Sequence, residues 1–255
     1  MLLPSASHCM WFTHPYGEGG GTVFDVMRSQ NADSNRSRTD STVRRLEREL
    51  RAAIVRFELR PGQRVTELDI AIRYGVSRQP VREAFIGLDR AGLVTVQPQR
   101  GTVVVRLSSR RLHEAQVVRA AVAVELVRRG CAAFDAGHRA AIDTALAAAA
   151  DAAQHGNRAG VLDANAEFHR ALAAGCGVAS AAEALENLKT HVDRAWWLSA
   201  PDSVAMLTTV AHHRAILAAI DARDPDAAAA AVRAEFADIQ SALPRLEAEH
   251  PALFE

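Results

Sequence analysis

Apolar residues in the first half of the chain recur at two spacings, one helical and one extended. A helical spacing of three or four positions runs from residue 41 to about residue 57 and predicts one helix. A second, shorter helix is predicted to begin at Thr66, because Asp69 stands at the capping-box distance, and to end at Gly75, because glycine adopts the left-handed conformation that stops a helix. Three of its apolar residues fall on one face: Leu68, Ala71 and Ile72.

A third helix and a hairpin follow directly. Ser77 is placed to cap this helix, and Pro80 falls in its first turn, where a missing N–H costs little. Its apolar face, expected to pack on a core, consists of Val81, Ala84, Phe85 and Leu88. After Gly92, two runs with alternating β-branched residues surround a short loop and predict a β-hairpin: Val94 with Val96, and Val103 with Val105. This order of elements is that of a winged helix-turn-helix.

The third helix carries residue types that read DNA. Arg78 and Arg82 are four positions apart near its N-terminus, so they project side by side. The major groove admits one helix, and arginine can pair bidentately with guanine or clamp a phosphate. Arg100, at the hairpin tip, is placed to reach the minor groove or a phosphate. The alternative is a two-helix corner with solvated arginines. The predicted DNA-binding residues are Arg44, Ser77, Arg78, Gln79, Arg82, Arg100 and Gly101.

The pattern is helical throughout from Arg110 to about Glu249, rich in alanine and without strand signals. Helices are predicted at about residues 110–135, 138–155, 159–175, 179–199, 203–223 and 225–247, the last opened by Asp224-Pro225. Six such helices predict an antiparallel bundle, with ligand sites typically inside it. The predicted fold class is mainly α: an N-terminal winged helix-turn-helix with a small β-hairpin wing, followed by an all-α antiparallel bundle.

Charge is distributed unevenly between these two parts. The 255 residues have a formal net charge of zero, which alone argues against nucleic acid. From Arg36 to Arg111, however, 17 arginines stand against 8 acidic residues, a net charge of +9. From Leu112 to Glu255, 12 basic residues stand against 19 acidic ones, a net charge of −7. A basic first domain and an acidic second domain fit DNA binding by the first.

Three cysteines without metal or redox spacing indicate a reducing compartment. No signal peptide and no apolar run near the roughly 20 residues that span a bilayer were apparent, so we expect a cytoplasmic protein without a membrane segment. Residues 1–39 mix Pro, Gly, Ser and Asn and predict a disordered extension, or alternatively an over-long start of the reading frame. The predicted domains are therefore 1–39, disordered; 40–106, winged helix-turn-helix; and 107–250, helical bundle.

Potential metal ligands occur on three of the predicted bundle helices. Asn165 and His169 are four positions apart and share a face, His213 lies on a later helix, and Glu235 lies on the last one. Such side chains projecting inward could hold one divalent metal. A histidine on an amphipathic helix is more often a surface or hydrogen-bonded core residue, so this pattern alone leaves the metal open.

The segment GVSRQPVREAF, residues 75–85, resembles the motif GVSRTPVREAL of the GntR family of bacterial transcription regulators. Gln79 replaces the usual Thr, Phe85 replaces the usual Leu, and the Arg100-Gly101 pair matches the family's wing tip. Leu68 is a departure, because it stands where members often carry an arginine that can contact a phosphate. The resemblance implies a DNA-binding function.

The bundle resembles the all-helical effector domain of FadR-type members, called FCD, through residues 165–169 (NAEFH), 213–217 (HRAIL) and 224–227 (DPDA). There, an Asp or Asn and three His commonly bind a metal that helps hold a carboxylate. The resemblance therefore implies a divalent metal (Zn, Mn or Ni) on Asn165, His169, His213 and Glu235. Glu replaces the usual His at 235, and Asn is a weaker ligand than Asp, which leaves the metal open. Arg119 and Arg194 are the candidate effector-binding cations.

Three functions are compatible with these residues. The first is a transcription regulator, by family inference a repressor, that binds a near-palindromic operator in double-stranded DNA as a homodimer and responds to a small carboxylate. The second is a metal-dependent helical enzyme acting on a small acid, against which we find no nucleophile–base pair and no phosphate loop. The third is a ligand-independent DNA-binding protein. We expect the first, and no enzymatic activity.

Overall fold

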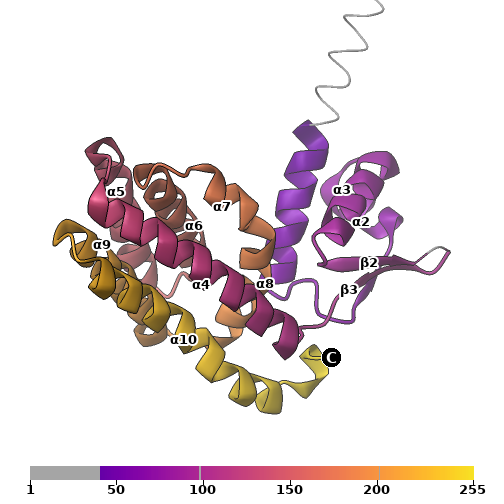
Figure 1. Cartoon of the computed structure of the whole chain (residues 1–255). Helices are drawn as coiled ribbons and strands as arrows, with labels where there is room; N and C mark the ends of the chain where they lie inside the picture. The colour runs from indigo at the N-terminus through magenta and orange to yellow at the C-terminus, as the bar shows by residue number, and fades with distance from the viewer. Residues whose placement is uncertain (1–40, 98, 201) are drawn as a thin grey trace, which may run out of the picture. The chain divides into compact units, whose positions relative to one another are not determined.

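The structure, a computed structural model, describes residues 41–97, 99–200 and 202–255. The predicted disordered extension lies outside these residues, as do Pro98 and Pro201. Residues 41–55 form the first described helix. The elements that follow it, up to residue 104, are β1 (Arg64–Val65), α2 (Glu67–Tyr74), α3 (Arg78–Arg90), β2 (Val94–Gln97) and β3 (Gly101–Val104) (Figure 1).

The hairpin is part of a three-stranded antiparallel sheet in the order β1-β3-β2. Val94 lies opposite Val104 and Gln97 opposite Gly101, as expected for a hairpin. β1 was not predicted, because a strand of two residues leaves no alternating pattern to detect. It pairs with β3, so the wing is anchored to the segment that leads into α2. The core beneath includes the buried side chains of Leu46, Leu50, Ile54, Phe85 and Leu88.

The ends of α2 are set by the residues that the sequence indicated. The Thr66 hydroxyl accepts a hydrogen bond from the Asp69 N–H at 3.1 Å, and Gly75 takes a left-handed φ of 64°. The apolar face was wrong in part: Ala71 is buried, but Leu68 and Ile72 are 53% and 72% exposed. α2 packs through neighbouring positions instead, so these two side chains stand at the surface.

The helical elements of the second part are α4 (Ser109–Ala132), α5 (Arg139–Gln154), α6 (Arg158–Gly175), α7 (Ser180–Ala184), α8 (Glu186–Ser199), α9 (Ser203–Asp221) and α10 (Pro225–Glu249), with short 3₁₀ turns at Ala136–His138 and Pro251–Leu253. The segment expected as one helix at 179–199 is divided at Leu185, whose ψ of −4° leaves the helical range. Neither glycine nor proline stands there, so the local sequence did not signal the break. Asp224 caps α10 as expected, accepting from Asp226 N and Ala227 N.

The bundle encloses buried alanine- and leucine-rich cores, and its C-terminal end continues beyond the predicted boundary at residue 250. Phe254 is buried, and the Leu107 N–H donates to the Leu253 carbonyl at 2.9 Å. The segment entering α4 is thus tied to the last residues of the chain.

By length and composition, α9 could cross a membrane, with a mean hydropathy of 1.3. This differs from the sequence pattern, which predicts no apolar run of that length. The apolar residues of α9 include a buried face in the bundle core, with Val210, Ile216 and Ile220 each at most 3% exposed. A core helix meets the same criteria as a membrane span, so this feature does not favour a membrane.

Candidate functional site

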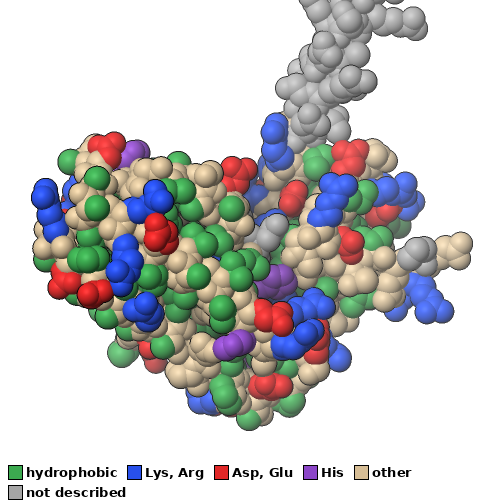
Figure 2. Space-filling model, in the orientation of Figure 1, with side chains coloured by type: hydrophobic (Ala, Val, Ile, Leu, Met, Phe, Trp, Pro, Cys, Tyr) green, Lys and Arg blue, Asp and Glu red, His purple; other side chains and the backbone are tan. Residues whose placement is uncertain are grey.

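A groove of about 590 Å³ lies between the start of α3 and the wing. Its lining includes Arg78 and Arg82 from α3, Glu67 and Leu68 from α2, and Gln99 from the hairpin loop. On the face shown in Figure 2, arginine side chains (blue) stand over the short helices and the wing. The structure thus brings two of the predicted DNA-binding arginines together in one concave surface.

The Glu67 carboxylate accepts hydrogen bonds from both Arg78 and Arg82. It accepts from Arg82 Nε at 2.8 Å and Nη2 at 3.1 Å, and from Arg78 Nη2 at 3.0 Å. The hydrogen bond from Arg82 is the main cause of the lowered pKa of Glu67, so its carboxylate is ionised at neutral pH. Arg78 and Arg82 remain 63% and 57% exposed. A single carboxylate therefore orients two cations that still face solvent. Sequence reasoning missed Glu67, although it falls in the first turn of α2.

The other predicted DNA-binding residues are exposed, except for the half-buried Gly101, and they have different structural roles. Ser77 precedes α3 without a side-chain capping bond, and the Gln79 amide donates to Glu83 Oε1 at 2.7 Å. The Arg100 side chain is at the wing tip, and its carbonyl accepts from Arg64. Gly101 has a φ of 86°, and a Cβ there would lie 3.2 Å from the Val65 carbonyl, so glycine is needed for the wing itself. Arg44 is exposed on the first helix.

The predicted metal ligands meet inside the bundle. His213 Nε2 lies 3.3 Å and His169 Nε2 lies 3.4 Å from the same oxygen, Glu235 Oε1. Phe168 stacks on the His213 ring with centroids 4.0 Å apart, which fixes the plane of that imidazole. Several polar atoms of this cluster are buried without a hydrogen-bond partner among the described residues: Asn165 Oδ1, His169 Nε2, His213 Nδ1 and Glu235 Oε2.

The pKa values of His169 and Glu235 give both groups the protonation states of metal ligands. Burial lowers the pKa of His169, against the opposing charge of Glu235, so its imidazole is neutral at neutral pH. Burial would by itself raise the pKa of Glu235, but its interactions with His169 and His213 hold it well below the usual range. The cluster therefore offers a neutral imidazole and an anionic carboxylate, the protonation states that metal binding requires.

The geometry of the cluster fits a metal. One ligand atom each from His169, His213 and Glu235 lies within 4.8 Å of the others. Ligands about 2.1 Å from a tetrahedral ion stand roughly 3.4 Å apart, close to the two His–Glu separations. Unpaired buried polar atoms are costly unless they find a partner, and a cation would provide one. Asn165 Oδ1 could supply a fourth, neutral oxygen.

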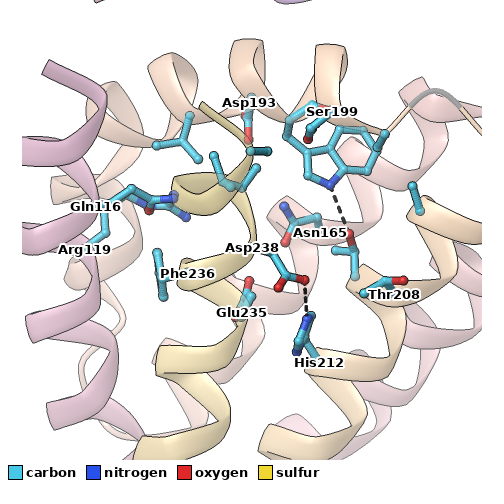
Figure 3. Close-up of a pocket in the computed structure, with 17 residues that line it drawn as sticks. Gln116, Arg119, Asn165, Asp193, Ser199, Thr208, His212, Glu235, Phe236 and Asp238 are labelled. Carbon is cyan, nitrogen blue, oxygen red and sulfur yellow. Dashed lines mark hydrogen bonds and ion pairs between the residues drawn. The ribbon is translucent and has the colours of Figure 1, made fainter. Parts of the chain in front are cut away.

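Two cavities adjoin this cluster, and Arg119, Glu235 and Phe236 line both. The first, about 210 Å³, is also lined by Asn165 and is drawn in Figure 3, where Arg119 and Gln116 project from α4 and Glu235 from α10. The second, about 490 Å³, is mostly apolar and reaches His169. The Arg119 guanidinium lies 4.9 Å from the centre of the Phe236 ring. A cationic group thus stands beside the candidate metal centre in both cavities.

The structure separates the two arginines that were candidates for effector binding. Arg119 lines both cavities, whereas Arg194 lines neither. Arg194 is fully buried on α8 and donates from Nη2 to the Val105 carbonyl at 2.6 Å. Its role in effector binding stays a prediction.

Comparison with known proteins gives a family match for each of the two parts of the chain. Residues 42–104 match the bacterial regulatory proteins of the gntR family, and residues 114–238 match the FCD domain. An uncharacterized HTH-type transcriptional regulator in an unstable DNA locus of Streptomyces ambofaciens is 31% identical over 215 residues, covering 80% of this chain and 86% of that protein. The chain belongs to the GntR family.

Further relatives agree with this GntR assignment. The HTH-type transcriptional repressor RspR of Escherichia coli (strain K12) is 28% identical over 205 residues, which cover 80% of this chain and 90% of that protein. The crystal structure of a putative transcriptional regulator GntR from Rhodococcus sp. RHA1 superposes with a TM-score of 0.66 at 26% identity, covering 80% of this chain and 98% of that one. The chain is therefore a DNA-binding transcriptional regulator with an FCD domain, and its family is not one of enzymes.

Proposed function

We propose that this GntR regulator is a cytoplasmic homodimeric repressor, released from a near-palindromic operator when a small carboxylate binds beside a metal in the FCD bundle. Residues 40–106 would form its DNA-binding domain and residues 107–250 its effector and dimerisation domain. The observation that carries the proposal is the convergence of His169, His213 and Glu235 next to two cavities that Arg119 lines. The relatives do not support an enzyme or a ligand-independent architectural protein.

At the DNA end, Arg78 and Arg82 are the proposed readers of the major groove, because they are exposed at the start of α3. Ser77, Gln79, Arg44, Arg100 and Gly101 complete the proposed contact surface, with the wing near a phosphate or the minor groove. Leu68 lines the groove, at the position where the resemblance to the GntR family implies that an arginine is common. It is 53% exposed and can contact a thymine methyl group, but it cannot bind a phosphate.

In the bundle, Asn165, His169, His213 and Glu235 are the proposed ligands of zinc, manganese or nickel. When bound, the metal supplies a positive charge and open coordination positions for an acid. Arg119 is the proposed partner of the carboxylate, because a guanidinium pairs with it in a planar, two-bond geometry. The apolar lining of the larger cavity favours a carboxylate with a hydrocarbon portion.

Repression and its release follow from differential affinity. Each protomer presents one α3, and a two-fold axis would place two such helices on two half-sites. A carboxylate that binds the DNA-incompetent arrangement more tightly lowers operator affinity by the ratio of its two affinities. RspR, a repressor, supports this sign of regulation.

The metal is tested by measuring the metal content of the purified full chain after incubation with zinc, manganese or nickel. We expect about one equivalent per chain. The double variant His169→Ala, His213→Ala should lose it. His212→Ala is the matched control, because His212 is the adjacent residue but pairs with Asp238 at 2.7 Å. If the control variant lost the metal as completely as the double variant, or if the wild type bound no metal, the metal would be removed from the proposal.

The regulatory part is tested separately with DNA. An operator is first selected from a random duplex pool, and its affinity is then measured by fluorescence anisotropy with and without a panel of mono- and dicarboxylic acids, in the presence of metal. We expect at least one acid to weaken binding in the wild type and to lose this effect in Arg119→Gln. Unchanged operator affinity with every acid would count against effector control but leave DNA binding intact.

A further inference from the structure

Arg194 is a buried cation whose hydrogen-bonding capacity is mostly unused. Its side chain is 0% exposed, and only Nη2 has a described hydrogen bond, to the Val105 carbonyl. Nε and Nη1 are buried with no hydrogen-bond partner among the described residues. Burial lowers the pKa of this guanidinium to about 10, so it stays charged at neutral pH. Such a charge is strongly destabilising unless an anion or a full set of acceptors compensates it.

The surroundings of Arg194 are positive. A small cavity of about 10 Å³ is lined by Arg194 together with Arg106, Arg111 and His191, and no Asp or Glu of the described residues lines it. The charges of Arg194 and Arg111, after burial, help to lower the pKa of His191. Any anion that reached this point would meet cationic groups from the linker, α4 and α8.

The start of α4 borders the same cavity. Ser108, which precedes this 24-residue helix, and Arg111 and Leu112, near its start, all line the cavity. Ser108 makes no side-chain capping bond, and the first turn contains no acidic residue. Ser108 therefore does not cap the N–H groups at this positive end of the helix dipole. The Ser109 hydroxyl donates to Glu247 Oε2 at 2.7 Å, but Glu247 does not line the cavity. A helix N-terminus combined with a buried arginine is an established arrangement for binding anions.

We propose that this cavity is a binding site for a small inorganic anion, separate from the effector site. The space admits about one water-sized group, which corresponds to a halide or to one oxygen of a small oxyanion. Arg194 Nε and Nη1 are its principal donors, with the α4 N-terminus behind it and Arg111, which is exposed, at the rim.

The site lies where β3 passes into α4. Arg194 already binds the carbonyl of Val105, the residue after β3, and Arg106 and Leu107 line the cavity. An anion would hold α8, the start of α4 and this linker in one arrangement. Its occupancy would therefore stabilise the junction between the wing and the bundle.

The test is the unfolding midpoint of the full chain in sodium chloride, bromide, sulfate or phosphate, with sodium gluconate as the reference at equal ionic strength. Gluconate is too large to enter. We expect a saturable rise in the midpoint with one of the small anions, because at 100 times Kd the folded state is favoured by about 100-fold. Arg194→Met should abolish this rise, while in gluconate it should be at least as stable as the wild type, since an uncompensated buried charge has been removed.

Arg158→Met is the matched control. Arg158 also donates one hydrogen bond to a backbone carbonyl, that of Trp197 at 3.0 Å, but it stacks on the Trp197 ring and does not line the cavity. It should retain the anion-dependent rise. If bromide is among the anions that raise the midpoint, crystals grown in bromide should show an anomalous peak beside Arg194. An equal anion effect in Arg194→Met, no rise with any of the small anions, or no bromide at Arg194 although bromide raises the midpoint, would overturn the proposal.

Discussion

Replacing Glu67 with glutamine should change how this regulator discriminates between DNA sequences. In the free protein, the Glu67 carboxylate accepts three hydrogen bonds from Arg78 and Arg82, the two arginines that start α3. Glu67→Gln retains the size of the side chain but removes the charge that orients them. The same charge also repels the phosphates that approach the groove. We therefore expect opposite effects on non-specific and specific binding.

The size of each effect follows from the geometry. Two unit charges about 8 Å apart in water interact by roughly 0.5 kcal/mol, which corresponds to about a 2.3-fold change in affinity without salt. Screening at about 0.1 M salt reduces the gain in non-specific affinity to less than about twofold. The salt slope should steepen by up to about one, as if another phosphate were neutralised. Ordering a long, freed side chain on specific DNA costs roughly 2- to 10-fold in affinity. The ratio of specific to non-specific affinity should thus fall by about that factor.

The assay is fluorescence anisotropy with a selected operator and a scrambled duplex over a series of salt concentrations. Glu58→Gln is the matched control, because Glu58 also pairs with one arginine, Arg73 at 3.3 Å, but does not line the groove. The control removes the same charge from the domain. The reasoning would be refuted if Glu58→Gln and Glu67→Gln changed the two DNA affinities equally. It would also be refuted if Glu67→Gln left the ratio of specific to non-specific affinity unchanged.

Three further predictions concern stability and reactivity. Thr66→Ala should lower the free energy of unfolding by about 1 kcal/mol in chemical denaturation, because it removes the cap bonded to Asp69. Gly130→Ala should cost about 1–3 kcal/mol in the same assay, since its Cβ would lie 2.9 Å from Cys176 Sγ and 3.5 Å from Ile220 Cδ1. Burial raises the pKa of Cys176 to about 11, so iodoacetamide should modify it at neutral pH only after unfolding, as mass spectrometry would show.

Local signals in the sequence were sufficient for most element boundaries. Thr66, Gly75 and Asp224 each act on a backbone within a few residues, and the structure shows all three in their predicted places. The division at Leu185 and the exposure of Leu68 depend on what packs nearby. No periodicity could indicate them.

In the candidate sites, too, some features followed from the local sequence and others required the tertiary structure. The positions of Asn165 and His169 on one helical face follow from 3.6 residues per turn. His213 and Glu235 were candidates on later helices, and the resemblance to FCD domains implied that all four residues bind one metal. The two cavities, and the placing of Arg119 rather than Arg194 beside them, required the packed bundle. Glu67 was overlooked because its partners lie 11 and 15 positions away.

The sequence by itself determined the winged helix-turn-helix and the helical domain, because caps, turns and apolar periodicity act over short distances along the chain. The family was indicated by the resemblance of its motif residues. Tertiary structure alone decided which polar groups meet. It brought Glu67 to two arginines and brought His169 and His213 to one carboxylate oxygen. It also left Arg194 buried with no counter-charge among the described residues. These contacts join residues from different elements, and their energies depend on burial and separation, which no stretch of sequence contains.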